Sequence, residues 1–124
     1  PVFKSIGDVV QNANNSYQRG QTVKVKFWSG HPKNNLRTQD TFMEVQRLVN
    51  GKWQVVATDN DWETKFEWQR IDGFWGTSHA ILSWTIPENT APGTYRLKHY
   101  GDKKKPWSGN IVGYTGTSRN FTVN

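Results

Sequence analysis

The densest group of side chains that can do chemistry is the run DNDWET at residues 59–64. Asp59 and Asp61 place two carboxylates at i and i+2, and Thr64 adds a hydroxyl at i+5. Such oxygen ligands can surround a hard cation such as Ca²⁺ or Mg²⁺. The same run can instead form a turn whose Asp and Asn side chains accept hydrogen bonds from nearby backbone N–H groups. Spacing alone favours the turn, because Asp-rich turns are common, and both interpretations stay open at this point.

Other catalytic signatures are missing from the sequence. The three histidines, His31, His79 and His99, do not have the spacing of metal ligands, and no HExxH, GxSxG or phosphate-cradling glycine motif occurs. There is no cysteine, which excludes disulfides and thiolate-ligated zinc. We therefore expect no catalytic residue and no intrinsic cofactor in this chain.

Seven tryptophans suggest a second class of function, an independent carbohydrate-binding module. Three of them fall on the apolar faces of predicted strands and are expected in the core: Trp53, Trp68 and Trp84. Three others fall on polar faces or in loops and are the candidates for a surface role: Trp28, Trp75 and Trp107.

The loop at residues 71–76 places two large aromatic side chains, Phe74 and Trp75, between two glycines. Such a loop can fold onto the core as a hairpin tip, contact another domain, or anchor the protein at a membrane interface. The sequence does not decide among these, so Phe74 and Trp75 are candidate membrane or domain contacts.

The elements that must position these groups are strands, because apolar residues recur with a period of two. Val23, Val25 and Phe27 alternate with polar residues, and so do the apolar residues of 80–86 and 95–99. Asn50-Gly51 predicts a two-residue hairpin, and the irregular stretch 41–49 before it suggests a bulge. About seven short strands predict an all-β, antiparallel, immunoglobulin-like sandwich, with a closed barrel as the alternative. Tyr95, which follows Pro92-Gly93, is expected to form a tyrosine corner.

Length and charge limit the classes of partner. The chain has 124 residues, enough for one domain spanning 1–124, and a formal net charge of +6. A basic chain can associate with anionic lipid, acidic proteins or nucleic acid. The basic residues are widely spread, so we expect no nucleic acid partner. Because the chain starts at Pro1 without a methionine, we expect it to be a piece of a longer protein.

Several separated motifs, in order, resemble one known family. They lie at DWETKFEW (61–68), LSWTIP (82–87), APGTYRL (91–97), Tyr100-Gly101 and Gly116-Thr117-Ser118. The chain resembles, from about Gly7 to Val123, the C-terminal immunoglobulin-like domain of the neutral (zinc-dependent) ceramidases.

The resemblance implies a non-catalytic accessory domain. Enzymes of the family hydrolyse the amide of ceramide to sphingosine and a fatty acid, with zinc and the catalytic groups in a large N-terminal domain. That domain is the implied partner within the same chain, and a membrane surface is a second one. In bacterial relatives a Ca²⁺ or Mg²⁺ site near the domain junction has a D-x-D-x-x-T pattern that looks like Asp59, Asp61 and Thr64. The implied location is secreted, or membrane-associated and extracellular.

Overall fold

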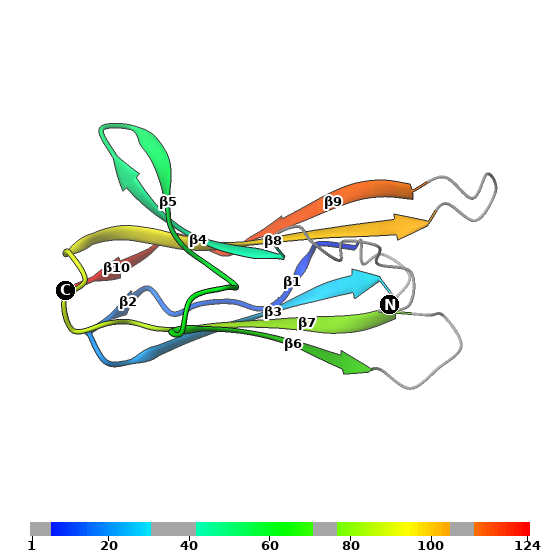
Figure 1. Ribbon diagram of the computed structural model, residues 1–124, viewed down its shortest axis with the longest axis horizontal. Coiled ribbons are helices and arrows are strands. Elements are labelled where there is room, and N and C mark those ends of the chain that lie inside the picture. Colours follow the sequence, from blue (N-terminus) through cyan, green and yellow to red (C-terminus); the bar gives the residue numbers. More distant parts are fainter. Residues whose placement is uncertain (1–5, 31–41, 71–76, 105–110) are drawn as a thin grey trace.

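The computed structural model describes residues 6–30, 42–70, 77–104 and 111–124 (Figure 1). They form ten strand segments: β1 (Val9–Gln11), β2 (Ser16–Tyr17), β3 (Thr22–Gly30), β4 (Met43–Val49), β5 (Lys52–Thr58), β6 (Thr64–Arg70), β7 (Thr77–Thr85), β8 (Gly93–Lys104), β9 (Ile111–Thr117) and β10 (Phe121–Val123). No helix among the described residues is long and apolar enough to cross a membrane.

The strands form two sheets that lie as layers, one above the other in Figure 1. The four-stranded sheet has the order β1-β3-β7-β6, and the six-stranded sheet has the order β2-β10-β8-β4-β5 with β9 also paired to β8. Among the described strands every pairing is antiparallel except that of β10 with β2. The predicted sandwich is confirmed. The count exceeds about seven because the alternation did not predict β1, β2 and β9, of which β1 and β2 have only three and two residues.

The core consists of the apolar side chains that alternate along the strands and point between the two sheets. Val23, Val25 and Phe27 of β3 are fully buried, and so is Leu82 of β7, the register partner of Val25. The six-stranded sheet contributes Val45, among others, to the same cluster. Period-two alternation turns one face of each sheet inward, so that the two faces exclude water from one another.

Aromatic rings fill one end of this core. The ring of Tyr95 lies 5.3 Å from that of Trp84 and 6.3 Å from that of Phe121. The Tyr95 hydroxyl donates a hydrogen bond of 2.6 Å to the carbonyl oxygen of Ala91. This bond forms the predicted tyrosine corner and ties the loop before β8 to the core.

The β4–β5 hairpin turns at the predicted residues. Asn50 and Gly51 have φ values of 51° and 77°, the left-handed pair that a two-residue type I′ turn requires. Figure 1 shows the hairpin standing away from the two layers at one edge of the molecule. Its outer strand, β5, therefore has a long, exposed border.

A bulge on β5 changes which of its side chains reach the core. Gln46 pairs with Val55 but Val45 pairs with Ala57, which leaves Val56 as the extra residue. The extra residue thus lies on β5 rather than on the preceding strand, where the sequence suggested it. Because the bulge breaks the alternation, Ala57 packs against the core while Trp53 does not, and the prediction of Trp53 in the core is wrong. Trp68 is half-buried against the core and Trp84 is buried.

Trp84→Ala is expected to lower the free energy of unfolding by roughly 3–5 kcal/mol, because the large side chain is only 3% exposed and its removal leaves a cavity. The matched control is Trp62→Ala, since Trp62 is 99% exposed and its loss should change stability by less than about 0.5 kcal/mol. Denaturant melts measure both. Equal losses in the two variants would contradict this description of the core.

Candidate functional site

The turn between β5 and β6 is held by its own side chains. One Asp61 carboxylate oxygen accepts a 2.7 Å hydrogen bond from the backbone N–H of Thr58, whose carbonyl in turn accepts a 3.0 Å bond from the Asp61 N–H. The Thr64 hydroxyl lies 2.7 Å from the Thr58 carbonyl oxygen and 2.8 Å from that of Asp61. Short Asp and Thr side chains thus satisfy the backbone of this turn, as the second interpretation of the sequence expected. The turn is therefore closed by its own hydrogen bonds although it lies at the surface.

Asp59 connects this turn to the neighbouring strand. One of its carboxylate oxygens accepts hydrogen bonds from the backbone N–H groups of Phe42, at 3.0 Å, and Met43, at 3.3 Å. Those N–H groups lie at the first residue of β4 and just before it, more than fifteen residues earlier in the chain. The carboxylate therefore fixes where the hairpin leaves the sandwich.

The three predicted cation ligands lie together in this turn. Within the described part of the chain, one oxygen each of Asp59 and Asp61 accepts backbone hydrogen bonds and the other has no protein partner. These two oxygens and the oxygen of the Thr64 hydroxyl suit a hard cation, but they fall short of the six or more ligands that Ca²⁺ takes. No three His, Cys, Asp or Glu side chains gather among the described residues. The residues present fit a partial site that needs further ligands.

The side chain in the middle of the turn is Trp62, which is 99% exposed. An exposed tryptophan contributes little to folding stability, whereas a tryptophan buried in a core or an interface contributes a large apolar area. The hydrogen bonds on either side hold the backbone that carries this side chain in place. The sequence analysis assigned no role to Trp62; its place inside a polar turn is the only signal that pointed to the surface.

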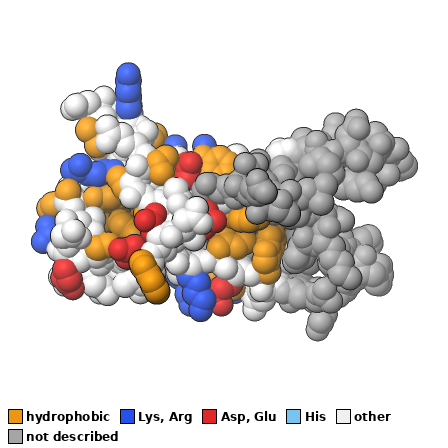
Figure 2. All heavy atoms as spheres, in the orientation of Figure 1, with side chains coloured by type: hydrophobic (Ala, Val, Ile, Leu, Met, Phe, Trp, Pro, Cys, Tyr) orange, Lys and Arg blue, Asp and Glu red, His pale blue; other side chains and the backbone are white. Residues whose placement is uncertain are grey.

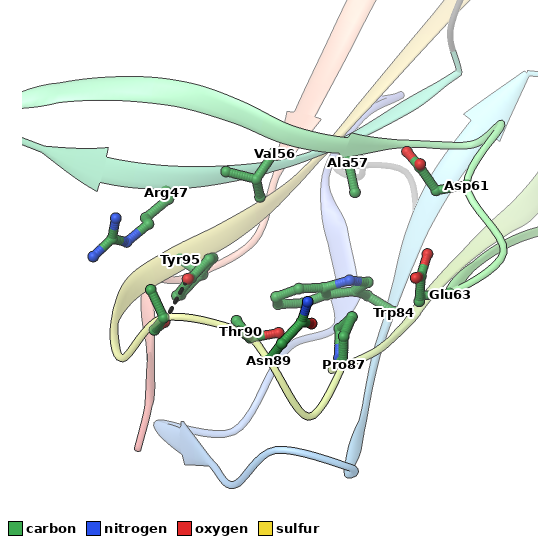
Figure 3. A pocket seen from close by; sticks show the side chains of 11 residues that line it. Arg47, Val56, Ala57, Asp61, Glu63, Trp84, Pro87, Asn89, Thr90 and Tyr95 are labelled. Atoms are coloured by element: carbon green, nitrogen blue, oxygen red, sulfur yellow. Dashed lines mark hydrogen bonds between the residues drawn. The ribbon is translucent and has the colours of Figure 1, made fainter.

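Next to the turn is an open groove of about 310 Å³ (Figure 3). Its lining comes from the β4–β5 hairpin, from the acidic turn and from the loop between β7 and β8. Figure 3 shows the Trp84 ring between Arg47 at one end and the carboxylates of Asp61 and Glu63 at the other. On the same face, hydrophobic and acidic side chains lie side by side (Figure 2). The groove suits an apolar group that also carries charge.

Arg47 and Tyr95 support the other end of the groove. Arg47 donates from Nη2 to the carbonyl oxygen of Pro92 at 3.1 Å. Burial raises the pKa of the Tyr95 hydroxyl above its usual value, an effect that the charges of Arg47 and Arg19 partly offset. The Tyr95 hydroxyl is thus a neutral hydrogen-bond donor at ordinary pH. It points at a backbone carbonyl and not at an acid–base partner.

Of the remaining predicted surface residues, the structure describes Trp28. Phe74 and Trp75, and with them Trp107, lie outside the described residues. Trp28 packs against His79 on the four-stranded sheet, with ring centroids 4.8 Å apart. None of these described residues reaches the groove.

The sequence and the fold both match known proteins. The family described as neutral/alkaline non-lysosomal ceramidase, C-terminal, matches residues 1–123. The chain belongs to this ceramidase family. The resemblance found in the sequence motifs is thereby confirmed.

Relatives of this ceramidase domain show how much of a longer protein it represents. It is 46% identical to the neutral ceramidase of Pseudomonas aeruginosa, and the match covers 98% of this chain and 18% of that protein. It is 40% identical to the neutral ceramidase of Oryza sativa, where the match covers 99% of this chain and 16% of that protein. The crystal structure of the Pseudomonas aeruginosa enzyme superposes with a TM-score of 0.90 at 43% identity, over 99% of this chain and 20% of that one. The chain therefore spans about a fifth, or less, of these relatives and corresponds to their C-terminal part.

In this ceramidase domain, Asp59→Ala is expected to cost roughly 1–2 kcal/mol of unfolding free energy, because the backbone N–H groups of Phe42 and Met43 lose their acceptor. Asp59→Asn keeps a carbonyl oxygen at the same place and should cost less. Asn60→Ala, in the same turn, serves as the control. Chemical denaturation measures all three, and an Asp59→Ala protein as stable as the control would contradict the structural role of this carboxylate.

Proposed function

We propose that this chain is a non-catalytic accessory domain of a neutral ceramidase. It packs on, and stabilises, the zinc amidase portion that hydrolyses ceramide to sphingosine and a fatty acid. The family match supports the proposal, together with the fact that the chain spans only the C-terminal part of its relatives. The isolated chain is accordingly expected not to cleave ceramide.

The observation that carries the proposal is Trp62 on its hydrogen-bonded turn beside the groove. The hydrogen-bonded turn fixes the backbone that carries the exposed Trp62, so little backbone entropy is lost when it binds, and buried tryptophans are frequent hot spots of interfaces. The groove adds a concave surface with the Trp84 ring and Pro87 in its lining. The projecting Trp62 side chain and the neighbouring groove together suit a shape-complementary interface with another folded domain.

The charges around the groove indicate the chemistry of the facing surface. Asp61 and Glu63 present carboxylates at one end and Arg47 presents a guanidinium at the other. A matching surface on the amidase portion has an apolar side chain for the groove, a cation near the acidic turn and an acceptor near Arg47. Such complementary charges fix the register of an interface more than they add affinity.

A divalent cation is the second part of the proposal. Asp59, Asp61 and Thr64 supply oxygen ligands to Ca²⁺ or Mg²⁺, and the amidase portion or water completes the shell. The cation relieves the repulsion between the two carboxylates and links the two portions. Because this chain supplies only part of the shell, binding by the chain alone should be weak.

Orientation of the enzyme at a membrane is a third part, and an extracellular location, secreted or membrane-associated, goes with it. The net charge of +6 is consistent with attraction to anionic lipid. The membrane contact suggested by the sequence at Phe74 and Trp75 stays a prediction.

Trp62→Ala is expected to weaken the association of this chain with a separately expressed amidase portion by roughly thirtyfold, the effect of a typical hot spot. Titration calorimetry measures the dissociation constant. Val10→Ala is the matched control, since Val10 is also exposed but lies on β1. If both variants bind as tightly as the wild type, the interface does not include this turn.

Calcium titration of the joined two-domain protein tests the cation. Wild type is expected to bind Ca²⁺ with a measurable heat, and Asp59→Asn/Asp61→Asn to lose it. Glu63→Gln removes a neighbouring charge outside the D-x-D-x-x-T pattern and should bind as the wild type does. Identical isotherms for all three proteins would rule out the cation but leave the docking proposal intact.

A further inference from the structure

The outer face of the β4–β5 hairpin exposes apolar side chains that nothing in the described part of the chain covers. Leu48 is 37% exposed and Val55 is 51% exposed. Trp53, the register partner of Leu48, is half-buried on the same face. The bulge at Val56 produces this arrangement, because without it Trp53 and Val55 would share the face of Ala57. Trp53, Leu48 and Val55 therefore form an apolar strip on a hairpin that projects from the sandwich (Figure 1).

Beside this strip, Arg96 of β8 is held in one conformation by two contacts. Its guanidinium carbon lies 4.0 Å from the centre of the Trp53 ring, and its Nε donates a 2.7 Å hydrogen bond to the side-chain oxygen of Gln46. Its two Nη groups have no acceptor among the described residues. A guanidinium fixed in this way presents a fork of N–H donors that suits an oxyanion and loses little entropy on binding one.

Lys98 adds a second cation on the same face, two residues along β8. Its Nζ lies 5.4 Å from the centre of the Tyr100 ring and forms no ion pair in the described part of the chain. The nearby carboxylate of Glu44 accepts hydrogen bonds of 2.8 Å from Tyr100 and from Gln46 instead. Glu44 is the register partner of Lys98, so among the described residues this part of the face has two cations and one carboxylate, and neither cation is in a direct ion pair with it.

We propose that this face docks on an anionic phospholipid bilayer. Arg96 and Lys98 bind lipid phosphates, while Leu48, Trp53 and Val55 lie at the level of the headgroups. Cations next to exposed aliphatic and aromatic side chains are the combination that binds membrane interfaces. A free phosphate ion, in contrast, would make no contact with the apolar strip. The inference rests on the proposed membrane role of the ceramidase and assigns that role to a surface outside the loop of Phe74 and Trp75.

This face is separate from the groove proposed to contact the amidase portion. Val56 lines the groove, whereas Val55, its neighbour in the chain, pairs with Gln46 beside Arg96. Both surfaces can therefore be engaged at the same time. Loss of one does not predict loss of the other.

Co-sedimentation with vesicles tests the proposal. The 124-residue chain is expected to bind vesicles of phosphatidylcholine that contain roughly 30–40% phosphatidylglycerol, which makes their surface negative. It is expected not to bind vesicles of phosphatidylcholine alone. Arg96→Gln/Lys98→Gln should weaken binding roughly thirtyfold. Lys24→Gln/Lys26→Gln removes the same charge from β3 in the other sheet and should leave most of the binding. Equal losses in the two double variants, or undiminished binding by the first, would overturn the proposal.

Two further variants separate the contributions of this face. Arg96→Lys keeps the charge but loses the planar fork that stacks on Trp53, so it should bind less tightly than the wild type. Leu48→Ser/Val55→Ser, at two exposed positions that should not unfold the chain, is expected to abolish the binding that persists in high salt. Wild-type binding by both would contradict the proposal. Association with the amidase portion, measured on the same variants, should be unchanged, which distinguishes failure of this inference from failure of the proposed function.

Discussion

The ring of Tyr95, packed against those of Trp84 and Phe121, makes the contact on which the rest of the domain depends. It joins the two sheets, because Trp84 belongs to β7 of one sheet and Tyr95 and Phe121 belong to β8 and β10 of the other. Its hydroxyl also holds the loop before β8 through the carbonyl of Ala91. That loop and the buried side of Trp84 then become the wall and floor of the groove. A core contact thus determines the shape of a surface feature.

The acidic turn shows how a surface segment can be ordered without a core. Its carboxylates and hydroxyl are used first to satisfy backbone groups, both within the turn and at the start of β4. The backbone that carries the exposed Trp62 is fixed by these bonds. The same geometry leaves one oxygen of each Asp available in the described part of the chain. The structural hydrogen bonds of the two Asp side chains and the proposed cation ligation would therefore use different carboxylate oxygens.

Two surfaces of the domain suit the two proposed kinds of contact. The groove and Trp62 combine a hollow, a knob and charges of both signs, which suits one particular protein surface. The outer face of β5, β4 and β8 has cations next to aliphatic side chains, which suits a fluid and chemically uniform partner. An enzyme portion bound at one and a bilayer at the other would be held at a defined angle by the sandwich between them.

Much of this structure could be read from the sequence, because the period-two alternation of a strand is a local property. Alternation placed Val23, Val25 and Phe27 in the core, Asn50-Gly51 placed a hairpin, and Pro92-Gly93 before Tyr95 indicated the tyrosine corner. The separated motifs were enough to identify the family.

Tertiary structure alone decided the two surfaces, since each depends on residues brought together from distant segments. The register between β4 and β5 determined that Val56 is bulged, and this single extra residue turned Trp53 out of the core to stack with Arg96. The groove likewise exists only where the hairpin, the acidic turn and the loop before β8 meet. Alternation specifies which side chains share a face of one strand, but pairing and packing between strands determine what that face meets.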